Sequence, residues 1–97
     1  MTKEDVLTYL RTNKSSFEQQ FGVVRIGLFG SYARDNAGKD SDLDLAIEMQ
    51  PDKKSLKNFL GFKRHLEAYF GKRVDLGIES ALKPLVREQV RKEVIYV

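Results

Sequence analysis

Residues 30–45 read Gly-Ser-Tyr-Ala-Arg-Asp-Asn-Ala-Gly-Lys-Asp-Ser-Asp-Leu-Asp-Leu, with ten residues between Ser31 and Asp42. Asp42 and Asp44 are two positions apart, so their side chains project from the same face of an extended strand. The Gly-Ser turn ahead of them can offer backbone N–H groups to a phosphate. This stretch therefore predicts a site for a divalent cation and a nucleoside triphosphate.

The length and composition predict one small domain that spans residues 1–97. The chain has 41% hydrophobic and 32% charged residues, which is ordinary for a soluble globular protein. It has no cysteine, so disulfides and thiolate metal sites are excluded. No apolar run is long enough to cross a membrane, and the acidic N-terminal residues are unlike a secretory signal. We therefore expect a cytoplasmic protein that does not bind a membrane.

The net charge of +3 comes from 17 basic and 14 acidic residues. The basic residues form separated pairs, such as Lys63-Arg64 and Lys72-Arg73, which are typical of solvated helix faces. A nucleic-acid-binding surface more often shows a clustered basic stripe. We therefore do not expect nucleic acid to be the main substrate.

The hydrophobic pattern predicts helices that alternate with short strands. The expected helices are residues 3–12, 15–21, a short one capped by Ser31, 53–70 and 80–92, and the expected strands are 23–29, 42–48, 73–78 and 94–97. Together they predict an α/β domain with a small mixed sheet. Helices should pack on one face of that sheet, and the carboxylates should lie on the open face.

A third aspartate, Asp75, lies on the polar face of its expected strand, so it can join the first two. If a right-handed crossover makes strands 42–48 and 73–78 parallel neighbours, Asp75 stands next to Asp42 and Asp44. Three such carboxylates repel one another, and oxygen ligands on one face are what Mg²⁺ or Mn²⁺ requires. We expect Asp42 and Asp44 to bridge two ions and Asp75 to bind the ion beside the nucleophile. Asp75 is also expected to accept the proton of the attacking hydroxyl.

The nucleotide is expected to bind on the other side of this site. Gly30 allows close approach of a phosphate to the backbone, and the Ser31 hydroxyl can donate to it. Arg34 follows one helical turn later and supplies a positive fork for the departing pyrophosphate. The donor is a nucleoside triphosphate, and nothing in the sequence reads its base.

These residues resemble the Gly-Ser and Asp-x-Asp signature of the DNA polymerase beta nucleotidyltransferase superfamily, most closely its minimal nucleotidyltransferase branch. The resemblance covers about residues 23–78. It implies a nucleotidyltransferase fold, metal binding by Asp42, Asp44 and Asp75, triphosphate contacts from Ser31 and Arg34, and ATP as the donor. One departure is Asp35, because many relatives have glycine there, and it adds a negative charge near the expected phosphate site.

Minimal members of this branch commonly accompany a helical HEPN protein as a toxin–antitoxin pair. The resemblance therefore implies an antitoxin that transfers AMP to a tyrosine hydroxyl of a HEPN-type toxin. One alternative is a binding module that neutralises the toxin by occlusion, without catalysis. Another is transfer to a small molecule of the aminoglycoside type, which is disfavoured because the chain has little beyond the core to enclose such a substrate.

Overall fold

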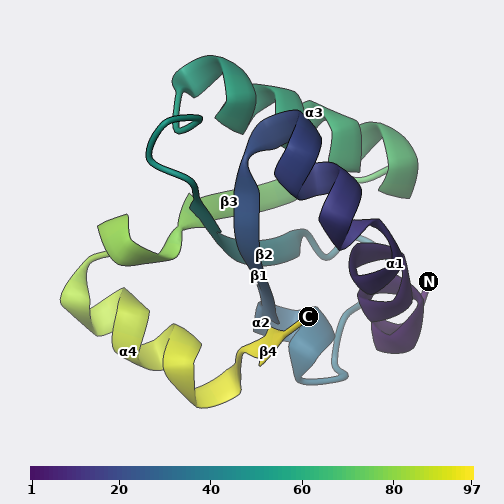
Figure 1. Ribbon diagram of the computed structural model, residues 1–97. Coiled ribbons are helices and arrows are strands. Elements are labelled where there is room, and N and C mark those ends of the chain that lie inside the picture. Colours follow the sequence, from purple (N-terminus) through teal and green to yellow (C-terminus); the bar gives the residue numbers. More distant parts are fainter.

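The computed structural model describes all residues from 1 to 97 and contains one sheet with four strands in the order β3-β2-β1-β4 (Figure 1). The strands are β1 (Val23–Phe29), β2 (Leu43–Met49), β3 (Val74–Ile78) and β4 (Ile95–Tyr96). β2 and β3 are parallel, whereas β1 pairs antiparallel with both β2 and β4. The sheet is therefore mixed, and the expected parallel neighbours are confirmed.

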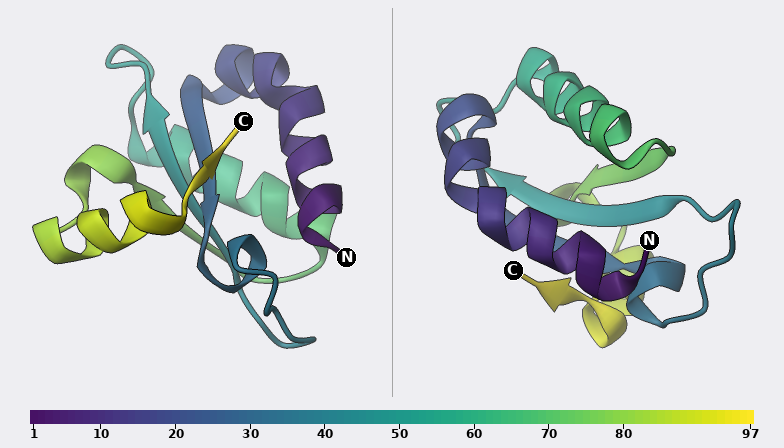
Figure 2. Two further views of the ribbon diagram at one scale, coloured as in Figure 1. Left: turned by 90° about the horizontal axis from the view of Figure 1, so that it is seen from below. Right: turned by 90° about the vertical axis from the view of Figure 1, so that its right-hand side faces the viewer.

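Two long helices cover one face of the sheet, as the two views of Figure 2 show. The helices are α1 (Lys3–Phe21), α2 (Gly30–Ala33), α3 (Leu56–Phe70) and α4 (Pro84–Glu93), with a short 3-10 turn, η1 (Glu79–Ala81), after β3. α1 and α3 pack against the sheet and against each other, and α4 lies across the sheet from them (Figure 1). The predicted fold class is confirmed, with α4 bordering the face that carries the carboxylates. No helix is both long and apolar enough to span a membrane.

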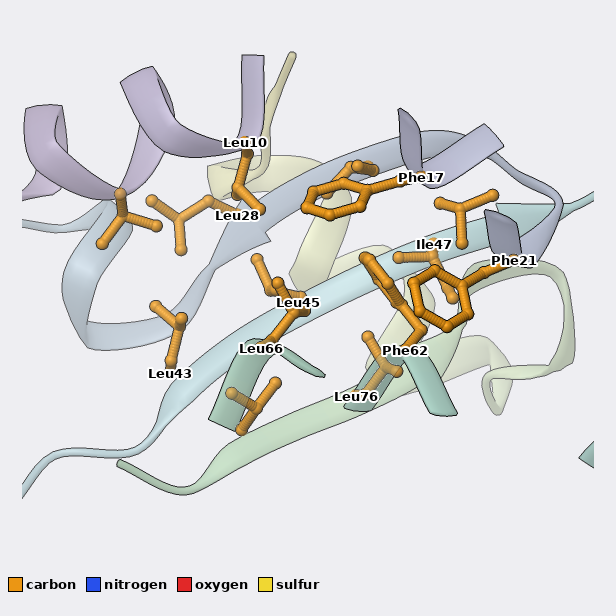
Figure 3. Close-up of a cluster of buried hydrophobic side chains, with 14 of the residues drawn as sticks. Leu10, Phe17, Phe21, Leu28, Leu43, Leu45, Ile47, Phe62, Leu66 and Leu76 are labelled. Atoms are coloured by element: carbon orange, nitrogen blue, oxygen red, sulfur yellow. The ribbon is translucent and has the colours of Figure 1, made fainter. Parts of the chain in front are cut away.

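The core lies between the sheet and the two long helices. Phe17 of α1 and Phe62 of α3 meet edge to face, with ring centroids 5.0 Å apart, above Leu45 and Ile47 of β2 (Figure 3). All four side chains are fully or almost fully buried. Removing this apolar surface from water is the main stabilising contribution in so small a domain, and it fixes which face of β2 turns inward.

The prediction of a break between two N-terminal helices was wrong, because α1 runs unbroken for 19 residues. Phe17 lies two turns beyond Leu10, so both side chains face the sheet and burying them outweighs the weak helix propensity of the residues between them. Asn13 stays in the helix by donating its side-chain amide to the carbonyl of Tyr9 at 2.9 Å.

Several predicted boundaries were also wrong. Helix α3 begins at Leu56 and not at residue 53, because the Ser55 hydroxyl caps it by accepting from the Asn58 amide at 3.1 Å. α4 begins at Pro84, where a missing N–H costs nothing, and residues 79–81 form a separate turn. α2 begins at Gly30, with Phe29 and not Ser31 at its N-cap position. Strands β2 and β3 begin one residue later than expected, and β4 is shorter.

The N-terminus of α1 offers a test of local stability. Thr2 and Asp5 form a reciprocal capping box, with bonds of 2.9 and 3.1 Å between each side chain and the other residue's amide. Thr2→Ala should lower the free energy of unfolding by about 1 kcal/mol, measured by urea denaturation. Thr12→Ala, an exposed mid-helix control, should leave it unchanged or slightly higher. Equal losses in both variants would contradict the capping role.

Candidate active site

The parallel pairing of β2 with β3 places two of the predicted aspartates side by side. The register aligns Asp44 with Asp75, and directly paired residues point to the same face of a sheet. Leu43 and Leu45 are fully buried in the core, so the alternating position of Asp44 is directed to the opposite face (Figure 3). Asp42 precedes β2 with the same alternation and is exposed. The three aspartates thus lie on one face, at neighbouring positions.

Gly30 packs directly against Asp44. Its φ angle is 76°, in the left-handed region that glycine adopts without strain. A Cβ added at this position would lie 2.1 Å from Oδ2 of Asp44, well inside van der Waals contact. Both the backbone conformation and the close approach therefore require glycine at the start of α2.

Ser31 and Arg34 follow on α2. The half-buried Ser31 hydroxyl has no hydrogen-bond partner within the protein, so it is free to bind a ligand. Arg34 donates from Nη1 to Oε2 of Glu93 at 2.7 Å, and half of its side chain is exposed. The guanidinium has five N–H donors, so this bond leaves others unused.

A cleft of about 280 Å³ joins these elements. One wall contains Gly30, Arg34 and Asp44, and the other is formed by α4 through Val86, Gln89, Val90 and Glu93, with Phe29 completing the lining. Ser31, Asp42 and Asp75 do not line the cleft itself. The structure therefore brings together a carboxylate, a guanidinium and a glycine turn at one opening.

The pKa of Asp44 is affected by its burial in this cleft and by the neighbouring carboxylates. Burial raises the pKa of Asp44 to about 6, with further increases from Asp75 and Asp42, and Arg34 opposes part of the shift. Burial and like charges both disfavour the ionised form of a carboxyl group. A cation at this point would relieve both effects.

No set of three or more acidic or histidine side chains is arranged as a ready-made metal site. Asp42 instead lies 3.9 Å from Nε of Arg73, in an exposed ion pair. The three aspartates share a face and supply oxygen donors, which suits Mg²⁺ or Mn²⁺, but their side chains would have to turn toward a common ion.

The raised pKa of Asp44 predicts a pH-dependent stability. The folded state holds the Asp44 proton up to about pH 6, whereas the ordinary value is 3.8, so stability should fall as the pH rises through this interval. Asp44→Asn removes that loss and should stabilise the metal-free protein by about 1 kcal/mol above pH 6, allowing for solvent screening of this half-buried group. Thermal melts at pH 4 and pH 7 test this, since the difference should vanish at pH 4. A constant difference would contradict the account.

The structure also accounts for Asp35. Its φ angle is 59°, in the left-handed region that glycine adopts without strain. The carboxylate pairs with Nζ of Lys3 at 2.8 Å, on α1. The negative charge that distinguished this sequence is thus neutralised by the N-terminal helix.

Two residues near the site were missed from the sequence. Lys72 was interpreted as part of a solvated pair, but it is half-buried, donates to the Ser41 carbonyl at 3.0 Å and contacts the hydroxyl of Tyr32. Glu93 accepts the Gly30 amide at 2.8 Å in addition to Arg34. The one sequence signal for Glu93 was its position directly after the predicted helix 80–92, where the helix dipole disfavours a negative charge unless a partner is present.

Comparison with known proteins assigns the family. A family model described as a nucleotidyltransferase domain matches residues 10–97. The chain belongs to this family. Among nucleotidyltransferase relatives, the protein adenylyltransferase MntA of Thermococcus cleftensis is 39% identical over 97 residues, covering 100% of this chain and 97% of the relative. A candidate protein adenylyltransferase of Methanocaldococcus jannaschii is 32% identical over 97 residues, covering 99% and 98%.

Solved structures show the same nucleotidyltransferase fold. A candidate minimal nucleotidyltransferase superposes with a TM-score of 0.80 at 39% identity, covering 98% of this chain and 95% of its own. A toxin–antitoxin structure with AMP-PNP superposes with a TM-score of 0.70 at 21% identity, covering 99% and 72%. The second likeness shows the fold alone, and the first agrees with the family assignment.

Proposed function

We propose that this nucleotidyltransferase moves AMP from ATP to a hydroxyl group of a partner protein, at a site formed by Asp42, Asp44 and Asp75. The observation that carries the proposal is the position of Asp44. It is paired with Asp75 across two strands and shares one cleft with Gly30 and Arg34. The carboxylate of Asp44 therefore lies beside both a second candidate metal ligand, Asp75, and a candidate phosphate-binding group, Arg34.

Asp42, Asp44 and Asp75 are the residues that would hold two divalent cations. Their carboxylate oxygens suit Mg²⁺, and Mn²⁺ could replace it. All three are hard oxygen donors, and burial together with the neighbouring Asp75 and Asp42 raises the pKa of Asp44, so a cation would favour its ionised form. When bound, the ions would neutralise charge on the triphosphate and lower the pKa of the attacking hydroxyl.

The side chains of the protein supply the remaining steps. Ser31 and Arg34 hold the phosphates that leave as pyrophosphate, through hydrogen bonds to their oxygens. The acceptor oxygen bonds to the α-phosphorus as the bond from that phosphorus to the bridging oxygen breaks. The proton of the acceptor hydroxyl passes to Asp75, which is exposed and is paired with Asp44 across the two strands.

The size of the cleft favours a macromolecular acceptor. The cleft beside Asp44 has a volume of about 280 Å³, and the triphosphate would occupy part of it, which leaves little room to enclose a second small molecule. A partner protein would bring its own hydroxyl to the opening. This disfavours an aminoglycoside-type substrate.

The comparisons suggest the class of partner. The Thermococcus relative is a protein adenylyltransferase, and a toxin–antitoxin pair, MntA–HepT, shares the fold with a TM-score of 0.59 at 19% identity. We infer that this chain acts as the antitoxin of a HEPN-type toxin. The competing hypothesis is that the chain neutralises the toxin by occlusion alone, which requires tight binding to the toxin but no transfer of AMP.

An experiment can separate transfer from occlusion. The chain is incubated with Mg²⁺, ATP labelled at the α-phosphate and the product of the neighbouring gene as the candidate toxin, and the label on that protein is measured. Transfer predicts label on the toxin and loss of toxin neutralisation in cells that carry Asp42→Asn. A tight unlabelled complex, with full neutralisation by Asp42→Asn, would establish occlusion.

A further inference from the structure

Glu93, the last residue of α4, contacts two neighbouring groups of the site that are both far from it in the sequence. Its Oε2 atom accepts the backbone N–H of Gly30 at 2.8 Å and Nη1 of Arg34 at 2.7 Å. The Glu93 side chain is 21% exposed and lines the same cleft as Asp44. One carboxylate oxygen therefore ties the glycine turn to the guanidinium that follows it.

The backbone that carries Glu93 is held firmly against the sheet. Val94 packs so closely over Gly27 that an added Cβ there would lie 2.5 Å from its Cγ2 atom. The next residues form β4, which pairs with β1, and the amide of Val97 donates to the Ile26 carbonyl at 3.0 Å. Glu93 thus projects from an anchored segment, as a residue that fixes geometry requires.

Two effects of Glu93 on nucleotide binding oppose each other. Its negative charge weakens the attraction of Arg34 for phosphate, but its hydrogen bonds hold the arginine in one orientation. Gly30 is buried and its N–H is bonded to Glu93, so the predicted phosphate contact from this N–H is not available in the structure. Arg34 uses one of its five donors on Glu93, which leaves the others for phosphate. The contacts therefore indicate that Glu93 orients Arg34 for phosphate binding more than it competes with phosphate for Arg34.

We propose that Glu93 is a positioning residue for nucleotidyl transfer. It holds the left-handed Gly30 turn against Asp44 and aims Arg34 at the leaving pyrophosphate. This inference rests on the proposed function, because it assigns Arg34 to the triphosphate. Glu93 itself is expected to contact neither the nucleotide nor the acceptor.

The test compares Glu93→Ala and Glu93→Gln in the wild-type and Arg34→Ala backgrounds. Misplacing Arg34 should make Glu93→Ala about ten- to a hundredfold slower in kcat at saturating nucleotide. Glu93→Gln keeps an acceptor oxygen, so it should recover much of the rate. With Arg34 already removed, Glu93→Ala should cost clearly less than in the wild-type background, because only the hydrogen bond to Gly30 is then lost. Glu88→Ala, an exposed control on α4 outside the cleft, should match the wild type.

Two results would overturn the inference. Faster transfer and tighter nucleotide binding by Glu93→Ala would show that Glu93 competes with phosphate. An equal loss with and without Arg34 would show a purely structural role.

If the wild-type chain transfers nothing, the proposed function fails, and ATP affinity by calorimetry then tests Glu93 separately. Weakened binding that depends on Arg34 supports positioning, and unchanged binding contradicts it.

Discussion

Replacing both Asp42 and Asp44 by asparagine should abolish nucleotidyl transfer while leaving the fold intact. Asparagine keeps the shape of the side chain but removes the negative charge that holds a divalent cation. Losing several kcal/mol of metal-assisted stabilisation corresponds to a loss of about a thousandfold or more in rate. The measurement is the single-turnover rate of transfer to the partner, with circular dichroism to check the fold.

The same variant should differ from the parent in its response to metal. Without Mg²⁺ it should melt at a higher temperature, because the repulsion around Asp44 has been removed. Mg²⁺ should raise the melting temperature of the parent and leave the variant unchanged, since only the parent binds the ion in its folded state. Asp52→Asn, in an exposed turn, is the matched control and should behave as the parent. Undiminished transfer by the double variant would refute metal catalysis at this pair.

The second large effect is expected from Gly30→Ala. The new Cβ would lie 2.1 Å from Oδ2 of Asp44, on a backbone with φ of 76°. Left-handed strain and overpacking together should lower the free energy of unfolding by about 2–4 kcal/mol. Transfer should also be lost, because Asp44 must move away from its place beside Asp75. Chemical denaturation and the transfer assay measure the two effects.

Gly71 provides a matched control for the backbone contribution. It has a φ angle of 66°, and an added Cβ would have no neighbour within 4 Å. Gly71→Ala should therefore cost only the left-handed strain, about 1 kcal/mol, and leave transfer unchanged. If both substitutions proved equally costly, the contact between Gly30 and Asp44 would not be the reason that glycine is required.

Sequence patterns predicted the strands and their faces well, because alternation is a local property. Strand 23–29 has the predicted bounds, and the parity of Asp75 on β3 placed it beside Asp44. The parallel pairing followed from the intervening helix and the handedness of crossovers. The roles of Asp42, Asp44, Asp75, Gly30, Ser31 and Arg34 stay predictions, and the variants above test those of Asp42, Asp44, Gly30 and Arg34.

Features that depend on distant contacts were not predicted. The continuity of α1 follows from the packing of Phe17 against Phe62, which only the folded chain brings together. Glu93 reaches Gly30 across 63 positions of sequence, and Lys72 reaches Tyr32 across 40. Spacing within a motif identifies the groups that carry out chemistry, but it does not identify the side chains that hold them in place.

The central claim is that AMP is transferred to a partner protein, and the intact mass of that partner tests it most directly. The partner is purified after incubation with ATP, Mg²⁺ and either the parent chain or the variant that carries Asp42→Asn and Asp44→Asn. The account predicts a partner heavier by one AMP group with the parent and unmodified with the variant. A gain of a single phosphate, or an unmodified partner that is nevertheless neutralised, would contradict it.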